Sequence, residues 1–371
     1  MNTARLQFNI IYTPNTVTYL VPLVHSLLAH SDCSFQLVSN GCGPAETELL
    51  QRFCAQEPRL AYCQLAATDT LEHGTALDLL HEKCSADWFC FMDSDVFATG
   101  AFGESVREQL ADCDVFSSGH PVWHAPEDIT LPTNFRRWQG SYCASASGVT
   151  LGFSYFAAYR NAALHRVRAA TNVGFGYRYW DDIAPELRAE LQALALDKTD
   201  YDTGKLLLAL MHARGLRLRT ARLPTLVHLG GVSALADDRG APRRRSPLDA
   251  IARQLASTGL ARPLYYLADL LRGLRHPSPG LSAAQTAKLP LRERRSMQTR
   301  RRKRASTARY FTALLRSLQD DAPSPLLPTL GYRPAEQRVA RAAAELRKLH
   351  AQTEQPAESP GAAVAFGEAR G

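Results

Sequence analysis

The sequence predicts an α/β protein with a mainly parallel, Rossmann-like sheet, helices on both faces of that sheet, and a basic α-helical C-terminal region. Over the first hundred residues, short apolar segments of strand character alternate with segments of helical periodicity. Strands separated by helices of this length form parallel βαβ units. Apolar residues make up 45% of the 371 residues, enough for a substantial core. The net charge is −7 over residues 1–240 and +14 over residues 241–371, which separates an acidic α/β half from a basic one.

The first half of the chain carries the clearest periodicities. Alternate residues of Leu6–Tyr12 are apolar, the period of a strand with one buried face. Pro44 opens a helix, because its fixed φ suits the first helical position. The predicted strands are 6–12, 35–39, 60–64 and 88–92, and the predicted helices between them are 18–28, 44–56 and 75–84.

Beyond residue 160 the elements are fewer. We expect helices at 162–169 and 204–214, the latter capped by Asp202 or Thr203 at its start and by Gly215 at its end, and a strand at 225–229. Helices are also expected near 262–274, 305–319 and 334–352. The resulting domains are a catalytic unit over 1–240, a basic helical accessory region over 241–352, and a disordered tail over 353–371.

Several functional classes have little support in the sequence. No signal-peptide pattern opens the chain and no apolar run is long enough to span a bilayer, so we expect a cytoplasmic protein. All eight cysteines precede residue 144 without a Cys-x-x-Cys pair, and no His-Glu-x-x-His occurs, which disfavours a zinc site. No phosphate-binding Gly-x-x-x-x-Gly-Lys-[Ser/Thr] motif is present either.

The sharpest motif is Asp93-Ser94-Asp95, which directly follows the apolar strand 88–92. Ligands of parallel sheets bind at the carboxyl ends of strands, where these two carboxylates would project. Two oxygen ligands on one turn suit a hard cation such as Mg²⁺ or Mn²⁺, which can balance charge on a departing diphosphate. An acidic turn that caps the next helix is the plainer interpretation, and the apolar strand before the motif favours the metal site.

The order and spacing of the motifs resemble those of GT-A-fold nucleotide-sugar glycosyltransferases, with the greatest similarity to bacterial members related to family 2. The resemblance spans about residues 6–233. The segments that carry it are the first strand to Thr13, Val38-Ser39-Asn40-Gly41, His73-Gly74-Thr75-Ala76-Leu77-Asp78, Asp93-Ser94-Asp95, Tyr201-Asp202-Thr203-Gly204-Lys205, and Val227-His228-Leu229-Gly230-Gly231.

This resemblance implies a GT-A-type fold and a role for each matching residue. Asp95 would be the main ligand of Mn²⁺ or Mg²⁺, Asp93 would reach the metal or the ribose, and His228 would complete the metal or diphosphate site. A lone histidine on an apolar strand is usually a core residue, but here two glycines follow it. The residues expected to face the nucleotide are Thr13, Asn40, His73, Gly74, Asp78 and Asp93.

The donor implied is a nucleoside-diphosphate sugar, with a UDP-sugar as the first expectation. Many relatives carry an acidic pair where this chain has Ser39-Asn40, so the choice of base stays open. Inverting transfer needs a general base near the acceptor hydroxyl, for which Asp202 ranks first and Asp182 second. Asp202 could equally be an N-cap residue, and the sequence leaves retaining transfer open.

The segment Arg294–Arg304 holds seven basic residues in eleven positions and should contact the membrane at its inner face if the acceptor is lipid-linked. A solvated arm without a partner is an equally good interpretation of this segment. We expect a glycan or lipid-linked acceptor in cell-surface polysaccharide synthesis. The alternatives are a nucleotidyltransferase acting on sugar phosphates, which lacks its glycine-rich basic loop here, and a non-catalytic nucleic-acid-binding protein, which lacks any known reading motif.

Overall fold

The computed structural model describes residues 6–118, 121–124, 137–138, 143–144, 150–152, 155–197, 200–232, 291–320 and 322–354. The helix expected near 262–274 lies outside these residues, as does the tail expected at 353–371 except for its first two residues, which are helical. Within the described parts of the chain, no helix is both long enough and apolar enough to cross a bilayer.

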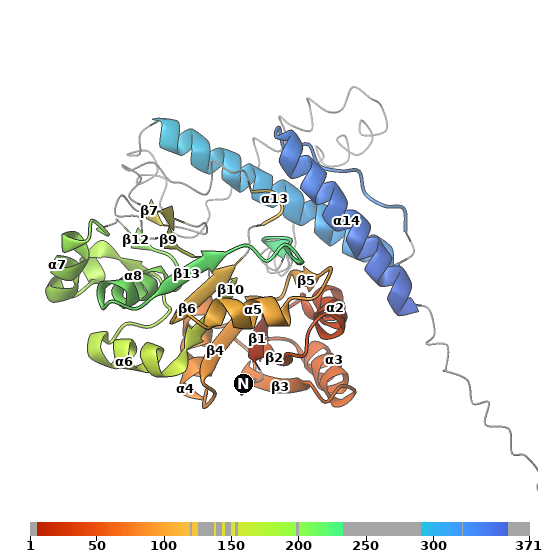
Figure 1. The fold of residues 1–371 in the computed structure, drawn as a ribbon. Coiled ribbons are helices and arrows are strands. Elements are labelled where there is room, and N and C mark those ends of the chain that lie inside the picture. Colours follow the sequence, from red (N-terminus) through yellow and green to blue (C-terminus); the bar gives the residue numbers. More distant parts are fainter. Residues whose placement is uncertain are drawn as a thin grey trace, which may run out of the picture.

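A seven-stranded mixed sheet forms the centre of the molecule (Figure 1). Its order is β13-β6-β10-β4-β1-β2-β3, and every neighbouring pair is parallel except those of β10, which runs antiparallel to both β4 and β6. The strands are β1 (Gln7–Tyr12), β2 (Ser34–Asn40), β3 (Leu60–Ala66), β4 (Trp88–Asp93), β6 (Val115–Ser118), β10 (Phe156–Arg160) and β13 (Leu218–Ala221). The four strands predicted in the first hundred residues are therefore confirmed.

Residues of alternating orientation divide the core into two clusters, one on each face of the sheet. Ile10 of β1 and Met92 of β4 belong to the first cluster, and Ile11 and Phe91 belong to the second. The helices of the first face are α1 (Val17–Leu20), η1 (Val21–Leu23), α2 (Val24–Ala29), α3 (Pro44–Ala55) and α5 (Gly103–Leu110). Those of the second are α4 (His73–Glu82), α6 (Asn161–Thr171), α7 (Pro185–Ala193) and α8 (Lys205–Ala213). The prediction of helices on both faces is correct.

Short strand pairs extend the sheet on the side where the strands end. β5 (Val96–Ala98) pairs antiparallel with β14 (Leu226–His228). A three-stranded group contains β7 (Arg137–Trp138), β11 (Arg178–Tyr179) and β12 (Asp200–Tyr201), and η3 (Trp180–Asp182) follows β11. The last pair is β8 (Cys143–Ala144) with β9 (Thr150–Leu151).

The N-terminal cap of the helix predicted at 204–214 differs from the structure. The N-cap of α8 is Gly204 at φ +74°, and not Asp202 or Thr203. The Asp202 carboxylate instead accepts a hydrogen bond from the N–H of the next residue, Thr203, at 2.9 Å. Because Thr203 precedes the N-cap, this bond does not cap α8. Gly215, at φ +75°, follows the end of the helix as predicted.

The basic segment is part of a helix and not a connection between helices. Arg294–Arg304 lies in the first half of α13 (Leu291–Gln319), which continues without a glycine or proline. Arginine and lysine are good helix formers, so the charge run itself propagates the helix. α13 packs beside α14 (Arg333–Glu354), and Figure 1 shows these two long helices, in blue, on one side of the sheet.

Both C-terminal helices contribute to the first core cluster. Phe311 and Leu314 of α13 and Val339 of α14 are each fully buried in it. They share that cluster with Leu229 and Val232, which follow β14. The described part of the basic region is thus joined by a common core to the side of the sheet that bears the site below.

Candidate metal centre

Asp93, Asp95 and His228 lie together at the carboxyl end of β4, although 133 positions separate the second aspartate from the histidine in the sequence. Asp93 is the last residue of β4, and Asp95 directly precedes β5. The antiparallel pairing of β5 with β14 sets His228 opposite Val96. The extended backbone therefore brings the histidine back to the turn that holds both carboxylates.

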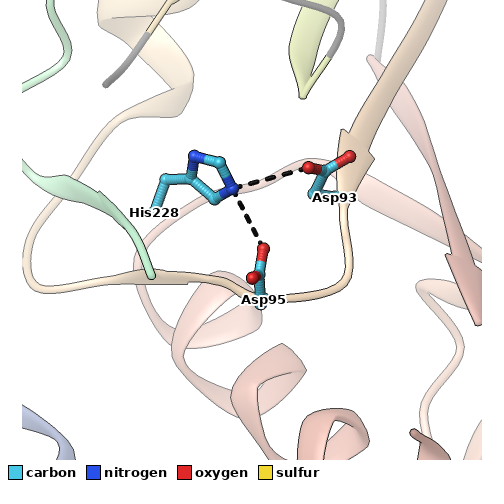
Figure 2. A group of neighbouring side chains, drawn as sticks. All are labelled: Asp93, Asp95 and His228. Carbon is cyan, nitrogen blue, oxygen red and sulfur yellow. Dashed lines mark ion pairs between the residues drawn. The ribbon is translucent and has the colours of Figure 1, made fainter. Parts of the chain in front are cut away.

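Three side-chain atoms converge in this cluster, as Figure 2 shows. The Nε2 atom of His228 lies 3.1 Å from Oδ1 of Asp95 and 3.4 Å from Oδ2 of Asp93. The side chains of Asp95 and His228 are 1% and 7% exposed, whereas that of Asp93 is 33% exposed. Two ligand atoms thus lie in the protein interior and the third opens toward solvent.

Asp95 is held by the backbone that follows β14. The N–H of Val232 donates to Oδ2 of Asp95 at 3.0 Å, and the N–H of Leu229 donates to the Asp95 carbonyl oxygen at 3.0 Å. These bonds occupy one carboxylate oxygen only. Oδ1 of Asp95 and both ring nitrogens of His228 are buried without a hydrogen-bond partner among the described residues. The short approach of Nε2 to the two carboxylates is an ion-pair contact that lacks hydrogen-bond geometry.

The electrostatics of the cluster are tightly coupled. Burial lowers the pKa of His228, but the carboxylates of Asp95 and Asp93 outweigh it and raise that pKa to about 9. Burial raises the pKa of Asp95, yet the positive charge of His228, the N–H of Val232 and the charge of Arg304 together hold it below its usual value. The site therefore keeps Asp95 ionised and attracts a cation, whether a proton on His228 or a metal.

The donor set fits a divalent metal ion. One oxygen from each aspartate and one imidazole nitrogen lie within 4.8 Å of one another. Buried polar atoms are normally hydrogen-bonded, and two of these ligand atoms are not, which is the pattern expected where a ligand supplies the missing contact. Carboxylate oxygens suit Mg²⁺ and Mn²⁺, and an imidazole nitrogen favours the softer Mn²⁺ of the two.

Two neighbours support the cluster, and one of them, Tyr155, could not be predicted from the sequence. The ring of Tyr155 stacks on that of His228 with centroids 3.9 Å apart, and its carbonyl oxygen accepts from the Asp93 N–H at 2.7 Å. Tyr155 precedes β10, so only the antiparallel pairing of β10 with β4 brings it here. Gly230, at φ +80°, lies against Pro121 and the indole of Trp123, where a Cβ atom would come within 2.7 Å of other atoms.

Of the residues expected at the nucleotide, Thr13 and Asn40 end neighbouring strands of the sheet. The Thr13 hydroxyl oxygen is buried without a hydrogen-bond partner among the described residues, so it can accept a ligand. Asn40 is occupied: its side-chain amide donates to the Leu71 carbonyl at 3.0 Å and accepts from the Leu71 N–H at 2.9 Å. Asn40 thus anchors the loop before α4.

Three more of the residues expected at the nucleotide belong to α4. His73 begins the helix and its ring lies edge-on to Phe91, with centroids 6.4 Å apart. Gly74 is buried against the backbone of Gly176, where a Cβ atom would clash at 2.6 Å. Asp78 forms an ion pair with Arg168 at 2.9 Å and accepts from the Phe175 N–H at 3.0 Å. Gly74 and Asp78 therefore fix the 173–176 loop against α4.

The two candidate bases differ in burial. Asp202 is half-buried and follows β12, and Asp182 is exposed in η3, which follows β11. β11 pairs with β12, so the two aspartates follow neighbouring strands of one small sheet. Lys205, three residues after Asp202, is buried and donates to the carbonyl oxygens of Leu151 and Gly152. The motif around Asp202 thus also ties α8 to β9.

The strand order, the single antiparallel strand and the carboxylates after β4 are consistent with one known architecture. The fold is of the GT-A type. No protein-family model matches the chain, and a search of curated proteins found no match.

The solved structures that match the chain include glycosyltransferases. The mannosyltransferase PcManGT from Pyrobaculum calidifontis, in complex with GDP-Man and Mn²⁺, is 14% identical with a TM-score of 0.39, and covers 94% of this chain and 84% of that one. TarS from S. aureus, residues 1–349 with UDP, is 15% identical with a TM-score of 0.37, over 94% and 91% of the two chains. The galactosyltransferase LgtC, with donor and acceptor sugar analogues, is 12% identical with a TM-score of 0.36, over 66% and 82%.

Proposed function

We propose that this chain is a metal-dependent glycosyltransferase that moves a sugar from a nucleoside-diphosphate sugar to an acceptor hydroxyl. The observation that carries the proposal is the convergence of Asp93, Asp95 and His228 at the carboxyl end of β4, where Oδ1 of Asp95 and the ring nitrogens of His228 are buried and have no hydrogen bond to a described residue. Structural carboxylates in such a position are ordinarily hydrogen-bonded or paired with arginine. Here Oδ1 of Asp95 instead faces Nε2 of His228 at 3.1 Å without a hydrogen bond, beside the carboxylate of Asp93.

Asp93, Asp95 and His228 would hold Mn²⁺ or Mg²⁺, which when bound neutralises negative charge on the diphosphate leaving group. The Val232 N–H, by bonding one oxygen of Asp95, leaves the other oxygen directed to the metal. Tyr155 fixes the plane of the His228 ring by stacking on it. Preorganisation of this kind lowers the cost of assembling the ligands when the metal binds.

The donor end of the site is assigned by proximity to the ends of the central strands. We propose that Thr13 and His73 contact the nucleotide, since the Thr13 hydroxyl is buried without a partner among the described residues and His73 opens α4. Asn40, Gly74 and Asp78 would support the nucleotide indirectly, through the loops that they anchor. A UDP-sugar stays our first choice of donor.

For the acceptor end, we propose Asp202 as the general base of an inverting transfer and Asp182 as the second candidate. Asp202 is half-buried whereas Asp182 is exposed, and a general base is usually a carboxylate partly shielded from water. The acceptor would be a glycan or a lipid-linked sugar of the cell surface.

A lipid-linked acceptor would place the enzyme at the inner face of the membrane, with the basic turns of α13 against anionic lipid. Cosedimentation with phosphatidylserine vesicles at low and high salt tests that contact. Binding that is lost when Arg294 and Arg295 are both changed to Gln supports it, and no binding at low salt eliminates it.

A thermal-shift screen of UDP, GDP, CDP, ADP and dTDP, each with Mn²⁺ or with chelator, tests the central proposal. A ligand that binds only the folded state raises its stability, by about 2.7 kcal/mol at a hundredfold excess over Kd. We expect one nucleotide to raise the melting temperature only when metal is present. If neither Mn²⁺ nor Mg²⁺ binds the wild-type protein, the proposed function is wrong.

A further inference from the structure

A cationic side chain of the C-terminal region reaches the metal cluster. Arg304 of α13 lies against Gly231, and its Nε atom is 2.7 Å from the position that a Cβ atom of Gly231 would occupy. Gly231 directly precedes Val232, whose N–H holds Asp95. Gly231 adopts φ +94°, a conformation in which other residues are strained, so both the backbone and the available space reserve this position for glycine.

The position of Arg304 on α13 explains why it is held there. Ala308, Phe311 and Leu315 are four, seven and eleven residues further along, on the same helical stripe; all three are buried, and Phe311 and Leu315 belong to the first core cluster. Arg304 continues this stripe beyond the core. The apolar contacts of α13 thus fix the helix in register and direct its arginine to the turn after β14.

A second anchor comes from α14, which packs beside α13. Arg338 donates to the carbonyl oxygens of Val122 and His124. The same segment contacts the glycine turn, since the indole N–H of Trp123 donates to the Gly230 carbonyl at 3.2 Å. Both C-terminal helices therefore attach to the segments that form one wall of the metal centre.

Arg304 is exposed, and none of the hydrogen bonds or ion pairs between described residues includes it. Its charge nevertheless acts on the cluster, where it helps to lower the pKa of Asp95. A guanidinium that is solvent-accessible, lies against the turn that holds Asp95 and takes part in no ion pair between described residues is placed to meet an anion held by the metal. Arginine is well suited to phosphate, because its planar donors can form two parallel hydrogen bonds.

We infer that Arg304 binds the diphosphate of the nucleotide sugar, so that the basic C-terminal helix contributes directly to the donor site. This inference rests on the proposed function. The metal would neutralise the diphosphate from the β4 side and the guanidinium from the side of α13, and the charge of the leaving group would then be stabilised by both.

The test measures two affinities in full-length wild type and in Arg304→Gln: that of Mn²⁺ alone, and that of the best nucleoside diphosphate from the screen at saturating Mn²⁺. Loss of a charged hydrogen bond should weaken nucleotide binding about tenfold. Removal of a positive charge beside Asp95 should instead tighten Mn²⁺ binding. These opposite shifts distinguish a phosphate contact from a general loss of structure, which would weaken both.

Arg309→Gln is the matched control, since it makes the same charge change on the same helix but lies roughly 140° around the helix axis. Arg304→Lys keeps the charge and should restore part of the nucleotide affinity. Unchanged nucleotide binding in Arg304→Gln overturns the inference while the proposed function stands. If the wild-type protein binds Mn²⁺ but no nucleoside diphosphate, the proposed function and this inference are both wrong.

Discussion

Two clusters of charged and polar side chains flank β4, and they are built in opposite ways. The first is the Asp93–Asp95–His228 centre, where buried ligand atoms lack hydrogen bonds. The second cluster, on the other face of the sheet, consists of Asp78, His81, Asn161 and Arg168. Each of these four side chains forms a hydrogen bond or an ion pair. Both contain carboxylate and imidazole groups, so composition alone does not separate them.

The second cluster is a closed network. The Asn161 amide donates to the carbonyls of Cys84 and Ala86, so its oxygen must accept from Nε2 of His81 at 3.0 Å. The other nitrogen of His81 then accepts from Arg168. Burial, followed by the charge of Arg168, accordingly lowers the pKa of His81 to about 4. His81, with both ring nitrogens hydrogen-bonded, is neutral and structural. His228 is charged, and its ring nitrogens have no hydrogen bond to a described residue.

The largest expected effect separates the clusters by activity. Asp95→Asn keeps an oxygen that can accept from Val232 but removes the charge of the main metal ligand. Loss of several kcal/mol of electrostatic stabilisation should lower turnover about 1,000-fold. The measurement is sugar release from nucleotide sugars that carry the nucleoside diphosphate identified by the screen, with the exposed Asp112→Asn as control. Full activity in Asp95→Asn with excess chelator would exclude the metal mechanism.

The second cluster should respond in stability and not in metal binding. Arg168→Met leaves the Asp78 carboxylate without its ion pair, and both side chains are less than a quarter exposed. The free energy of unfolding should fall by about 2 kcal/mol. Urea denaturation in chelator measures this, and Mn²⁺ affinity should be unchanged. A stable variant that has lost nucleotide binding would instead return Asp78 to the nucleotide site predicted from the sequence.

The pH dependence of metal binding offers a finer test. His228 has a pKa of about 9 in the metal-free protein, so a metal must displace its proton at neutral pH. Mn²⁺ affinity should rise about tenfold per pH unit between pH 7 and 8, with release of about one proton, measurable by calorimetry in buffers of different ionisation enthalpy. In chelator the sign reverses: the raised pKa stabilises the fold below pH about 6.5, and this contribution is lost as the pH rises through about 9. A pH-independent affinity would contradict the ligand role of His228.

The smallest effect is expected at Asn40. Asn40→Ala removes both side-chain bonds to Leu71 and should lower the free energy of unfolding by about 1 kcal/mol. Nucleotide affinity should change far less than in Arg304→Gln. Thermal denaturation and nucleotide titration of the same preparation measure both quantities. A large loss of affinity at unchanged stability would show that Asn40 contacts the nucleoside directly.

Local patterns predict the strands of the sheet and the turn with Asp93 and Asp95, whereas His228 is implied only by the family resemblance. A run of apolar residues is enough to locate a buried strand, and Asp93 and Asp95 lie at the end of one such strand, β4. The supporting contacts depend on pairings that no local pattern contains. Arg168 meets Asp78 across ninety residues, and Tyr155 meets His228 only because β10 runs antiparallel to β4. The contact of Arg304 with Gly231 is of the same kind, since it joins segments that are far apart in the sequence.

The attachment of α13 and α14 has a consequence for how the molecule is assembled. The apolar surface around Leu229 and Val232 is synthesised well before Phe311 and Val339, which cover it in the finished fold. A growing chain that ends near residue 240 would leave this surface exposed to water, where it invites aggregation or chaperone binding. Solubility of the chain would then depend on α13 and α14, and a product that terminates before these helices should be insoluble.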